Sequence, residues 1–127
     1  MKLLLDTSVL IDVLCARNRR RELLADLTRA GHTLTTTVLN VAELYSGMRP
    51  GEEARTESLL SGLLCYELTG AAARLAGKWK FAWSQKGRTL ALADTIIAAI
   101  SREQHCRLLT DNRKDFPLSE VNLYPLP

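Results

Sequence analysis

Four acidic residues of this chain occupy positions where a carboxylate is costly. Asp6 follows the apolar run Leu3–Leu5, and Asp111 likewise follows a second short apolar run. Asp94 lies within the otherwise apolar stretch ALADTII, and Glu43 lies within NVAELYSG, each at helical spacing from apolar residues. Taken singly, each has an ordinary explanation: a helix cap, a favourable helix-dipole position, a solvent-facing helix edge or a turn.

Taken together, the carboxylates indicate a metal site. The carboxyl ends of neighbouring parallel strands meet at one edge of a sheet, so these groups would converge in a single cleft. Carboxylates a few ångströms apart cannot all stay ionised without cations, and no Lys or Arg lies within the apolar runs. A hard divalent cation with oxygen ligands, such as Mg²⁺, would balance them. Such a site polarises a phosphoryl oxygen and activates water, which indicates phosphodiester hydrolysis.

The surrounding segments alternate between strand and helix patterns. Strand patterns cover residues 2–5, 32–39, 63–68 and 106–111, with 121–126 as a further candidate; helix patterns cover 7–15, 17–32, 39–48, 51–64, 70–85 and 94–104. Alternation of this kind predicts right-handed β-α-β connections. The expected fold class is therefore α/β, with a mostly parallel central sheet and helices on both of its faces.

Length and composition are consistent with one domain over residues 1–127. Hydrophobic residues make up 46% of the chain, which is enough for one core, and no apolar run reaches the roughly 20 residues that span a bilayer. Asp6 and Asp12 interrupt the first apolar stretch, and no cleavage site follows, so we expect a cytoplasmic protein with no membrane segment. The net charge of +3 permits a polyanionic partner without demanding one.

Cysteine and histidine provide no competing site. Cys15, Cys65 and Cys106 are odd in number, widely spaced and in apolar surroundings, which predicts small buried side chains in a reducing compartment. The two histidines, His32 and His105, adjoin no nucleophile or acidic partner in a catalytic motif, so both are predicted to be structural or on the surface.

Four segments of the chain resemble the four signature segments of the PIN domain: LLLDTSVLIDVL, NVAELYSG, ALADTIIAAI and LLTDNRKDF. More narrowly they resemble VapC, the ribonuclease toxin of VapBC toxin–antitoxin modules, and they occur in family order over residues 1–116. The resemblance implies an α/β/α sandwich with a parallel sheet of about five strands. It implies an endoribonuclease that depends on one or two Mg²⁺ ions, with Mn²⁺ as a substitute. It also implies a homodimer and a VapB-type antitoxin whose C-terminal segment covers the active site.

The same resemblance implies which residues form the site. Asp6, Glu43 and Asp94 match the first three acidic positions of the family and are expected to bind the metal, Glu43 directly or through water. The fourth position falls on either of two residues, Asn112 or Asp115, and Asp115 completes the expected catalytic set.

Smaller polar residues are expected to support these carboxylates. Asp111 falls on an unconstrained position of the last motif. Thr7, Ser8 and Thr110 match small polar positions of the family and are expected to hydrogen-bond to the carboxylates.

Basic and aromatic residues allow two interpretations each. The cluster Arg17, Arg19, Arg20 and Arg21 suits RNA phosphate contact near the cleft, but a solvated helix face explains it equally well. The residues Lys78, Lys80, Lys86 and Arg88 have the same two explanations. Trp79 and Trp83, four residues apart, are predicted to lie in the core or a subunit interface rather than to stack on bases.

Two other functions compete with the ribonuclease hypothesis. Phosphoryl transfer to Asp6 would require a second Asp at position 8, where Ser8 stands, or an adjacent acidic pair with a late Lys, which is not present. A catalytically idle PIN scaffold that binds RNA or a protein is the other alternative. Against it, an idle acidic cleft would carry an electrostatic cost without a use.

Overall fold

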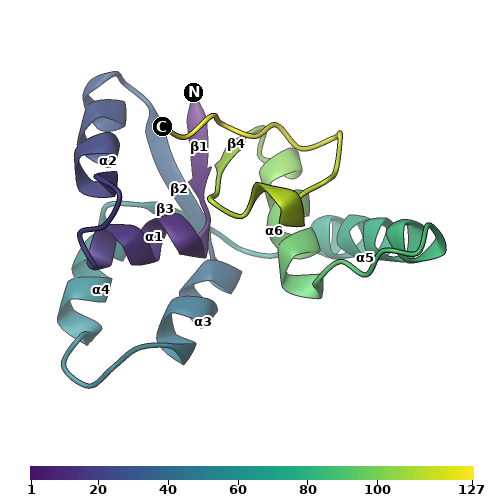
Figure 1. Ribbon diagram of the computed structural model, residues 1–127, viewed down its shortest axis with the longest axis horizontal. Helices are drawn as coiled ribbons and strands as arrows, with labels where there is room; N and C mark the ends of the chain where they lie inside the picture. The colour runs from purple at the N-terminus through teal and green to yellow at the C-terminus, as the bar shows by residue number, and fades with distance from the viewer.

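The short apolar run near the N-terminus forms the centre of a parallel sheet. In the computed structural model, which describes residues 1–127, β1 (Lys2–Leu5) lies between β2 (Thr33–Thr37) and β4 (Arg107–Leu109) (Figure 1). The strand β3 (Leu64–Tyr66) pairs with β2 at one edge, which gives the order β3-β2-β1-β4. All pairings are parallel, so helices must connect the strands, and the predicted α/β class is confirmed.

The sheet has four strands, not the approximate five that were expected. The segment predicted as a last strand makes a single parallel bridge, between Leu123 and Leu108. The backbone of Leu108 bonds to Asn122 and Tyr124 on either side of this bridge, each at 2.8 Å. Pairing goes no further, and the carbonyl oxygen of Tyr124 accepts from Arg113 Nη1 at 3.2 Å instead.

Six helices and one short 3₁₀ turn complete the chain. They are α1 (Thr7–Leu14), α2 (Arg20–Arg29), α3 (Val38–Ser46), α4 (Glu53–Ser61), α5 (Gly70–Gln85), α6 (Leu92–Glu103) and the turn η1 (Arg113–Asp115). Each helix lies within or close to a segment that the sequence predicts as helical. The largest difference is at α2, which begins at Arg20 because Asn18 and Arg19 have a left-handed backbone with φ near 54°.

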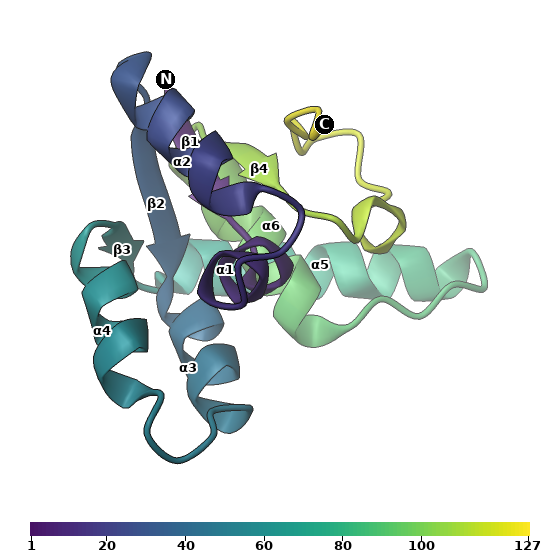
Figure 2. The ribbon, with the colours of Figure 1, turned by 60° about the vertical axis from the view of Figure 1, so that its left-hand side comes forward.

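The helices cover the two faces of the sheet (Figures 1 and 2). On one face Leu3 and Leu5 pack with α1 and α2, and on the other Leu4 packs with α5 and α6, as the alternation of side chains along β1 requires. Trp79 is buried in the second of these clusters and Trp83 packs against it, which confirms a core position rather than base stacking.

The cysteine prediction is only partly correct. Cys106 is buried, whereas Cys15 and Cys65 are exposed, and all three are free thiols. Cys15 is exposed because it caps the end of α1, and Cys65 because it lies on the edge strand β3. No helix combines the length and the apolar character that crossing a membrane requires.

Candidate active site

Asp6 stands at the carboxyl end of the central strand and is only 5% exposed. Its backbone N–H donates to the Leu109 carbonyl oxygen at 2.9 Å, which continues the pairing of β1 with β4. Thr110 Oγ1 donates to Asp6 Oδ2 at 2.7 Å, and Asn40 Nδ2 donates to Asp6 Oδ1 at 3.3 Å. The carboxylate makes no capping bond to α1, so both of its oxygens are held by neighbours beyond that helix.

Asn40 is the site residue that the sequence analysis missed. It is fully buried in the first turn of α3, where its Nδ2 also donates to Thr7 Oγ1 at 3.0 Å. Thr37 Oγ1 donates to Asn40 Oδ1 at 2.7 Å and accepts from its backbone N–H at 3.2 Å. Its spacing of three residues from Glu43 places both on one helix face, and that spacing is the signal that could have identified it.

Glu43 reaches the site from the same helix. Thr7 Oγ1 donates to Glu43 Oε1 at 2.7 Å, so the half-buried carboxylate is attached to the first turn of α1. Thr7 and Thr110 therefore support carboxylates as predicted. Ser8 differs, because its Oγ accepts from the backbone N–H of Asp111 at 3.2 Å instead.

Asp94 lies in the first turn of α6 and is half-buried. Burial raises its pKa to about 6, with further contributions from the carboxylates of Asp6, Asp115 and Glu43. Burial also raises the pKa of Asp6, although the hydrogen bond from Thr110 acts in the opposite direction. Four carboxylates from three helical segments and one strand end thus act on one another.

The two candidates for the fourth position, Asn112 and Asp115, differ in their surroundings. Asp115, at the end of η1, is partly buried and close enough for its charge to raise the pKa of Asp94. Asn112 is exposed, and its backbone N–H donates to Thr110 Oγ1 at 3.0 Å. Asp111 pairs with Arg20 at 2.7 Å.

Comparison with known proteins identifies the family of this chain. The model of the PIN domain family matches residues 3–121. This chain belongs to the PIN-domain family. Ribonuclease VapC19 of Mycobacterium tuberculosis is 30% identical to it over 115 residues, which cover 91% of this chain and 92% of that protein. Ribonuclease VapC10 of the same organism is 31% identical over 118 residues, covering 93% and 88%.

A solved structure shares the fold at lower identity. VapBC2 from Rickettsia felis, in a structure bound to a DNA fragment from its promoter, matches with a TM-score of 0.83 at 21% identity over 98% of both chains. The expected PIN family and its VapC group are therefore confirmed for this chain.

The four site carboxylates, Asp6, Glu43, Asp94 and Asp115, have no basic partner. The ion pairs of the chain join other residues: Arg19 with Glu22, Arg20 with Asp111, Arg29 with Asp26 and Arg55 with Glu52. No three His, Cys, Asp or Glu side chains lie close enough to enclose an ion by themselves. The oxygen-only donor set nevertheless fits a hydrated Mg²⁺, which keeps several waters and needs only one or two carboxylates.

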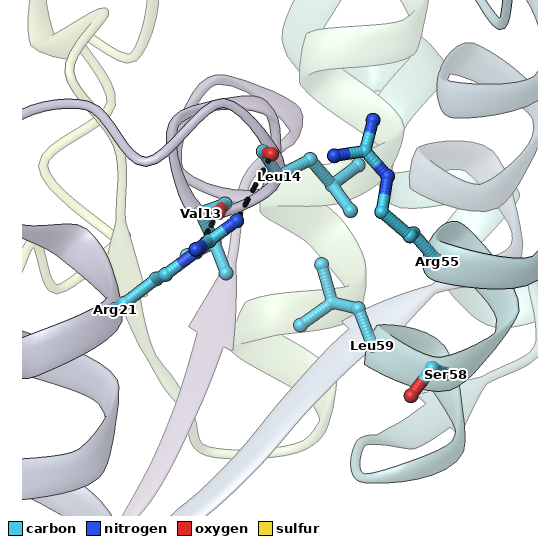
Figure 3. Close-up of a pocket in the computed structure, with 6 residues that line it drawn as sticks. All are labelled: Val13, Leu14, Arg21, Arg55, Ser58 and Leu59. Carbon is cyan, nitrogen blue, oxygen red and sulfur yellow. Dashed lines mark hydrogen bonds between the residues drawn. The ribbon is translucent and has the colours of Figure 1, made fainter. Parts of the chain in front are cut away.

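The predicted basic cluster divides into three kinds of residue. Arg20 is buried against Asp111, and this burial removes it from the candidate RNA contacts. Figure 3 shows Arg21 reaching the end of α1, where its Nε donates to the Val13 carbonyl at 2.8 Å and its Nη2 to the Leu14 carbonyl at 3.3 Å. Arg21 is exposed as well, as are Arg17 and Arg19. Arg19 pairs with Glu22 at 3.7 Å, so Arg17 is the one exposed member of the cluster whose side chain has no partner.

Proposed function

We propose that this PIN domain is a metal-dependent endoribonuclease and the toxin component of a VapBC-type toxin–antitoxin module. One observation carries the proposal: the charges of Asp6, Glu43 and Asp115 act on Asp94, none of the four has a basic partner, and the pKa of Asp94 is raised to about 6. Shifts of this kind are concentrated at functional sites. Relatives named ribonucleases, 30–31% identical over about nine-tenths of the chain, support nuclease chemistry.

Mg²⁺, with Mn²⁺ as a substitute, is the proposed cofactor. Asp6 and Asp94 would hold one or two ions, with Glu43 joining directly or through water. When bound, such an ion supplies Lewis-acid chemistry: it polarises a phosphoryl oxygen and makes water a nucleophile near neutral pH. The donor types support this assignment, because all are carboxylate oxygens, which hard divalent cations prefer.

The chain's own residues orient these donors. Thr110 and Asn40 fix the two oxygens of Asp6, and Thr7 fixes one oxygen of Glu43. No hydrogen bond contributes to the pKa of Asp94, which leaves its carboxylate open to a ligand. Held in this way, the carboxylates are organised before an ion or an RNA phosphate arrives, so little reorganisation is needed on binding.

The proposed partners follow from the same family. The Rickettsia felis structure is a VapBC complex, which supports a VapB-type antitoxin as the partner of this chain. A homodimer is proposed with it.

An RNA cleavage assay tests the function. Wild-type protein with Mg²⁺ is expected to cleave RNA, and either EDTA or Asp94→Asn is expected to abolish cleavage because each removes the metal or one of its ligands. Equal, EDTA-insensitive activity in both proteins would overturn the proposal. If neither cleaves and millimolar Mg²⁺ or Mn²⁺ leaves the melting temperature unchanged, the chain is instead an idle scaffold, since a ligand of the folded state must raise it.

A further inference from the structure

Arg20 is the one buried residue among the 17 Lys and Arg residues of the chain, and it is 4% exposed. Its Nη2 donates to Asp111 Oδ1 at 2.7 Å, and its Nη1 donates to the carbonyl oxygens of Asn18 at 3.3 Å and Pro127 at 3.5 Å. A buried guanidinium loses its hydration, and an apolar residue would avoid that loss. Packing alone therefore does not explain the buried ion pair between Arg20 and Asp111.

The turn between α1 and α2 fixes where Arg20 enters its helix. Ala16, Asn18 and Arg19 all have left-handed backbones, with φ of 53–54°, which residues with a Cβ rarely adopt. The buried Asp12 holds this turn, because its Oδ2 accepts from Asn18 Nδ2 and its carbonyl accepts from the Arg17 N–H, both at 2.8 Å.

Asp111 connects Arg20 to the active site. Its backbone N–H donates to Ser8 Oγ, and the preceding Thr110 donates its hydroxyl to Asp6. Asp115 lies four residues after Asp111, and its backbone N–H donates a hydrogen bond to the Asn112 carbonyl oxygen at 2.9 Å. The segment 110–115 thus carries two groups of the site and is attached to α2 through the side chain of Asp111.

We propose that Arg20 is a positioning residue of the active site: by holding Asp111 it fixes the segment 110–115, and with it the Thr110 hydroxyl on Asp6 and the carboxylate of Asp115. This inference rests on the proposed function, because it concerns the same metal-binding edge. An ion pair suits the task since it fixes the orientation of its two partners, which an apolar contact would not do. Breaking the ion pair between Arg20 and Asp111 should therefore weaken metal binding, in addition to any decrease in the stability of the fold.

Mn²⁺ binding to the full metal-free chain, followed by the electron paramagnetic resonance of the free ion, tests this role. Arg20→Met and Asp111→Ala are each expected to weaken Mn²⁺ binding by about tenfold or more, as loss of a supporting partner does. The double variant should be no weaker than the weaker single variant, because both remove one interaction. Asp111→Asn should retain most of the affinity, since its amide oxygen still accepts from Arg20.

Leu27→Ala is the matched control. Leu27 is buried on the same helix, within the core beneath α2, so its loss lowers stability without touching segment 110–115. Arg20 and Asp111 variants that melt earlier but bind Mn²⁺ as the wild type does would overturn the inference. If Arg20→Met does not fold, the two Asp111 variants decide, because the Asp111 side chain is 34% exposed. Wild-type protein that binds no Mn²⁺ would instead contradict the proposed function itself.

Discussion

At Asp94, burial and repulsion both oppose ionisation, and no neighbouring cation compensates. Its position in the first helical turn of α6 offers only a modest dipole benefit of about 0.3–1 kcal/mol. A purely structural residue at this position would be more favourable if it were neutral. The metal ion proposed above would offset this cost.

The metal-free protein is expected to lose stability as the pH rises through the pKa of Asp94. This pKa is about 6 in the folded chain against an ordinary 3.8, so the folded state binds the proton more tightly than the unfolded state. The stabilisation is complete below about pH 4 and is lost as the pH passes about 6. Asp94→Asn removes the titration, so in EDTA its melting temperature should exceed that of the wild type near pH 7.5 and match it near pH 4.

The corresponding difference in the free energy of unfolding near pH 7.5 is on the order of 1 kcal/mol, after allowing for the partial exposure of Asp94 to solvent. Glu22→Gln, at an exposed position on α2, is the control and should show no such pH dependence. Saturating Mg²⁺ should reverse the order of the two melting temperatures at neutral pH. An Asp94→Asn protein that melts well below the wild type at both pH values would reveal a structural role for Asp94.

Some site residues could be predicted from the sequence and others could not. Asp6, Glu43 and Asp94 were identifiable because an acid in an apolar context is visible in the sequence. Asn40 and Arg20 were not, because a polar side chain reveals neither its burial nor its partners until the helices are packed. The fourth position stays a prediction between Asn112 and Asp115, and the charge of Asp115 acts on Asp94.

At the scale of elements, the junction of β2 and α3 positions two site residues, Asn40 and Glu43. Thr37 ends the strand, caps the helix by accepting from the Asn40 N–H, and holds the Asn40 side chain at 2.7 Å. Since Asn40 and Glu43 share a face of α3, the cap sets the position of both. The stability of one helix start and the geometry of the site are therefore coupled.

Thr37→Ala and Thr69→Ala separate these two effects. Both threonines are helix N-caps whose hydroxyl accepts a backbone N–H, Thr37 at α3 and Thr69 at α5. Each variant is expected to lose about 1 kcal/mol of unfolding free energy, the usual value of a cap. Only Thr37→Ala should also weaken Mn²⁺ binding, because only Thr37 orients the amide that holds Asp6. Calorimetry and Mn²⁺ titration measure the two effects, and equal Mn²⁺ affinity in both variants would contradict the coupling.

Element types were predictable because apolar periodicity and Gly or Pro signals are local. The helix of residues 70–85 was predicted to the residue, since its apolar residues recur at helical spacing and Gly87, with φ of 85°, follows its end. The strand prediction that failed depended on contacts between segments distant in the sequence. Residues 121–126 have a strand-like composition, yet Leu123 finds a partner only at Leu108, so the extent of pairing depended on the short length of β4.

At the scale of the whole molecule, a small net charge of +3 is distributed around an acidic site. The acidic residues meet at the carboxyl edge of the sheet, and basic residues approach them from a neighbouring loop. Arg88, which follows α5, donates to the backbone carbonyl of Lys114, the residue before Asp115. Both side chains are exposed, so they can attract an RNA backbone to an edge that would otherwise repel it.

Charge reversal at Arg88 is therefore expected to weaken RNA binding more than reversal at Arg29. Arg29 is also exposed, but it ends α2 just before the amino end of β2, at the opposite edge of the sheet. In an Asp94→Asn background, which is expected to abolish cleavage, Arg88→Glu should reduce affinity for a single-stranded RNA by about tenfold. It should also lower the slope of log affinity against log salt by roughly 0.7 for each phosphate contact that is lost.

Fluorescence anisotropy over a range of salt concentrations measures both quantities for the two variants. Arg29→Glu makes the same change in net charge, so its effect estimates the general electrostatic contribution, which acts at any surface position. A larger loss for Arg88→Glu locates the RNA backbone beside Lys114 and Asp115. Equal losses and equal salt slopes in the two variants would mean that RNA responds to the net charge of the chain and that this loop gives no directed contact.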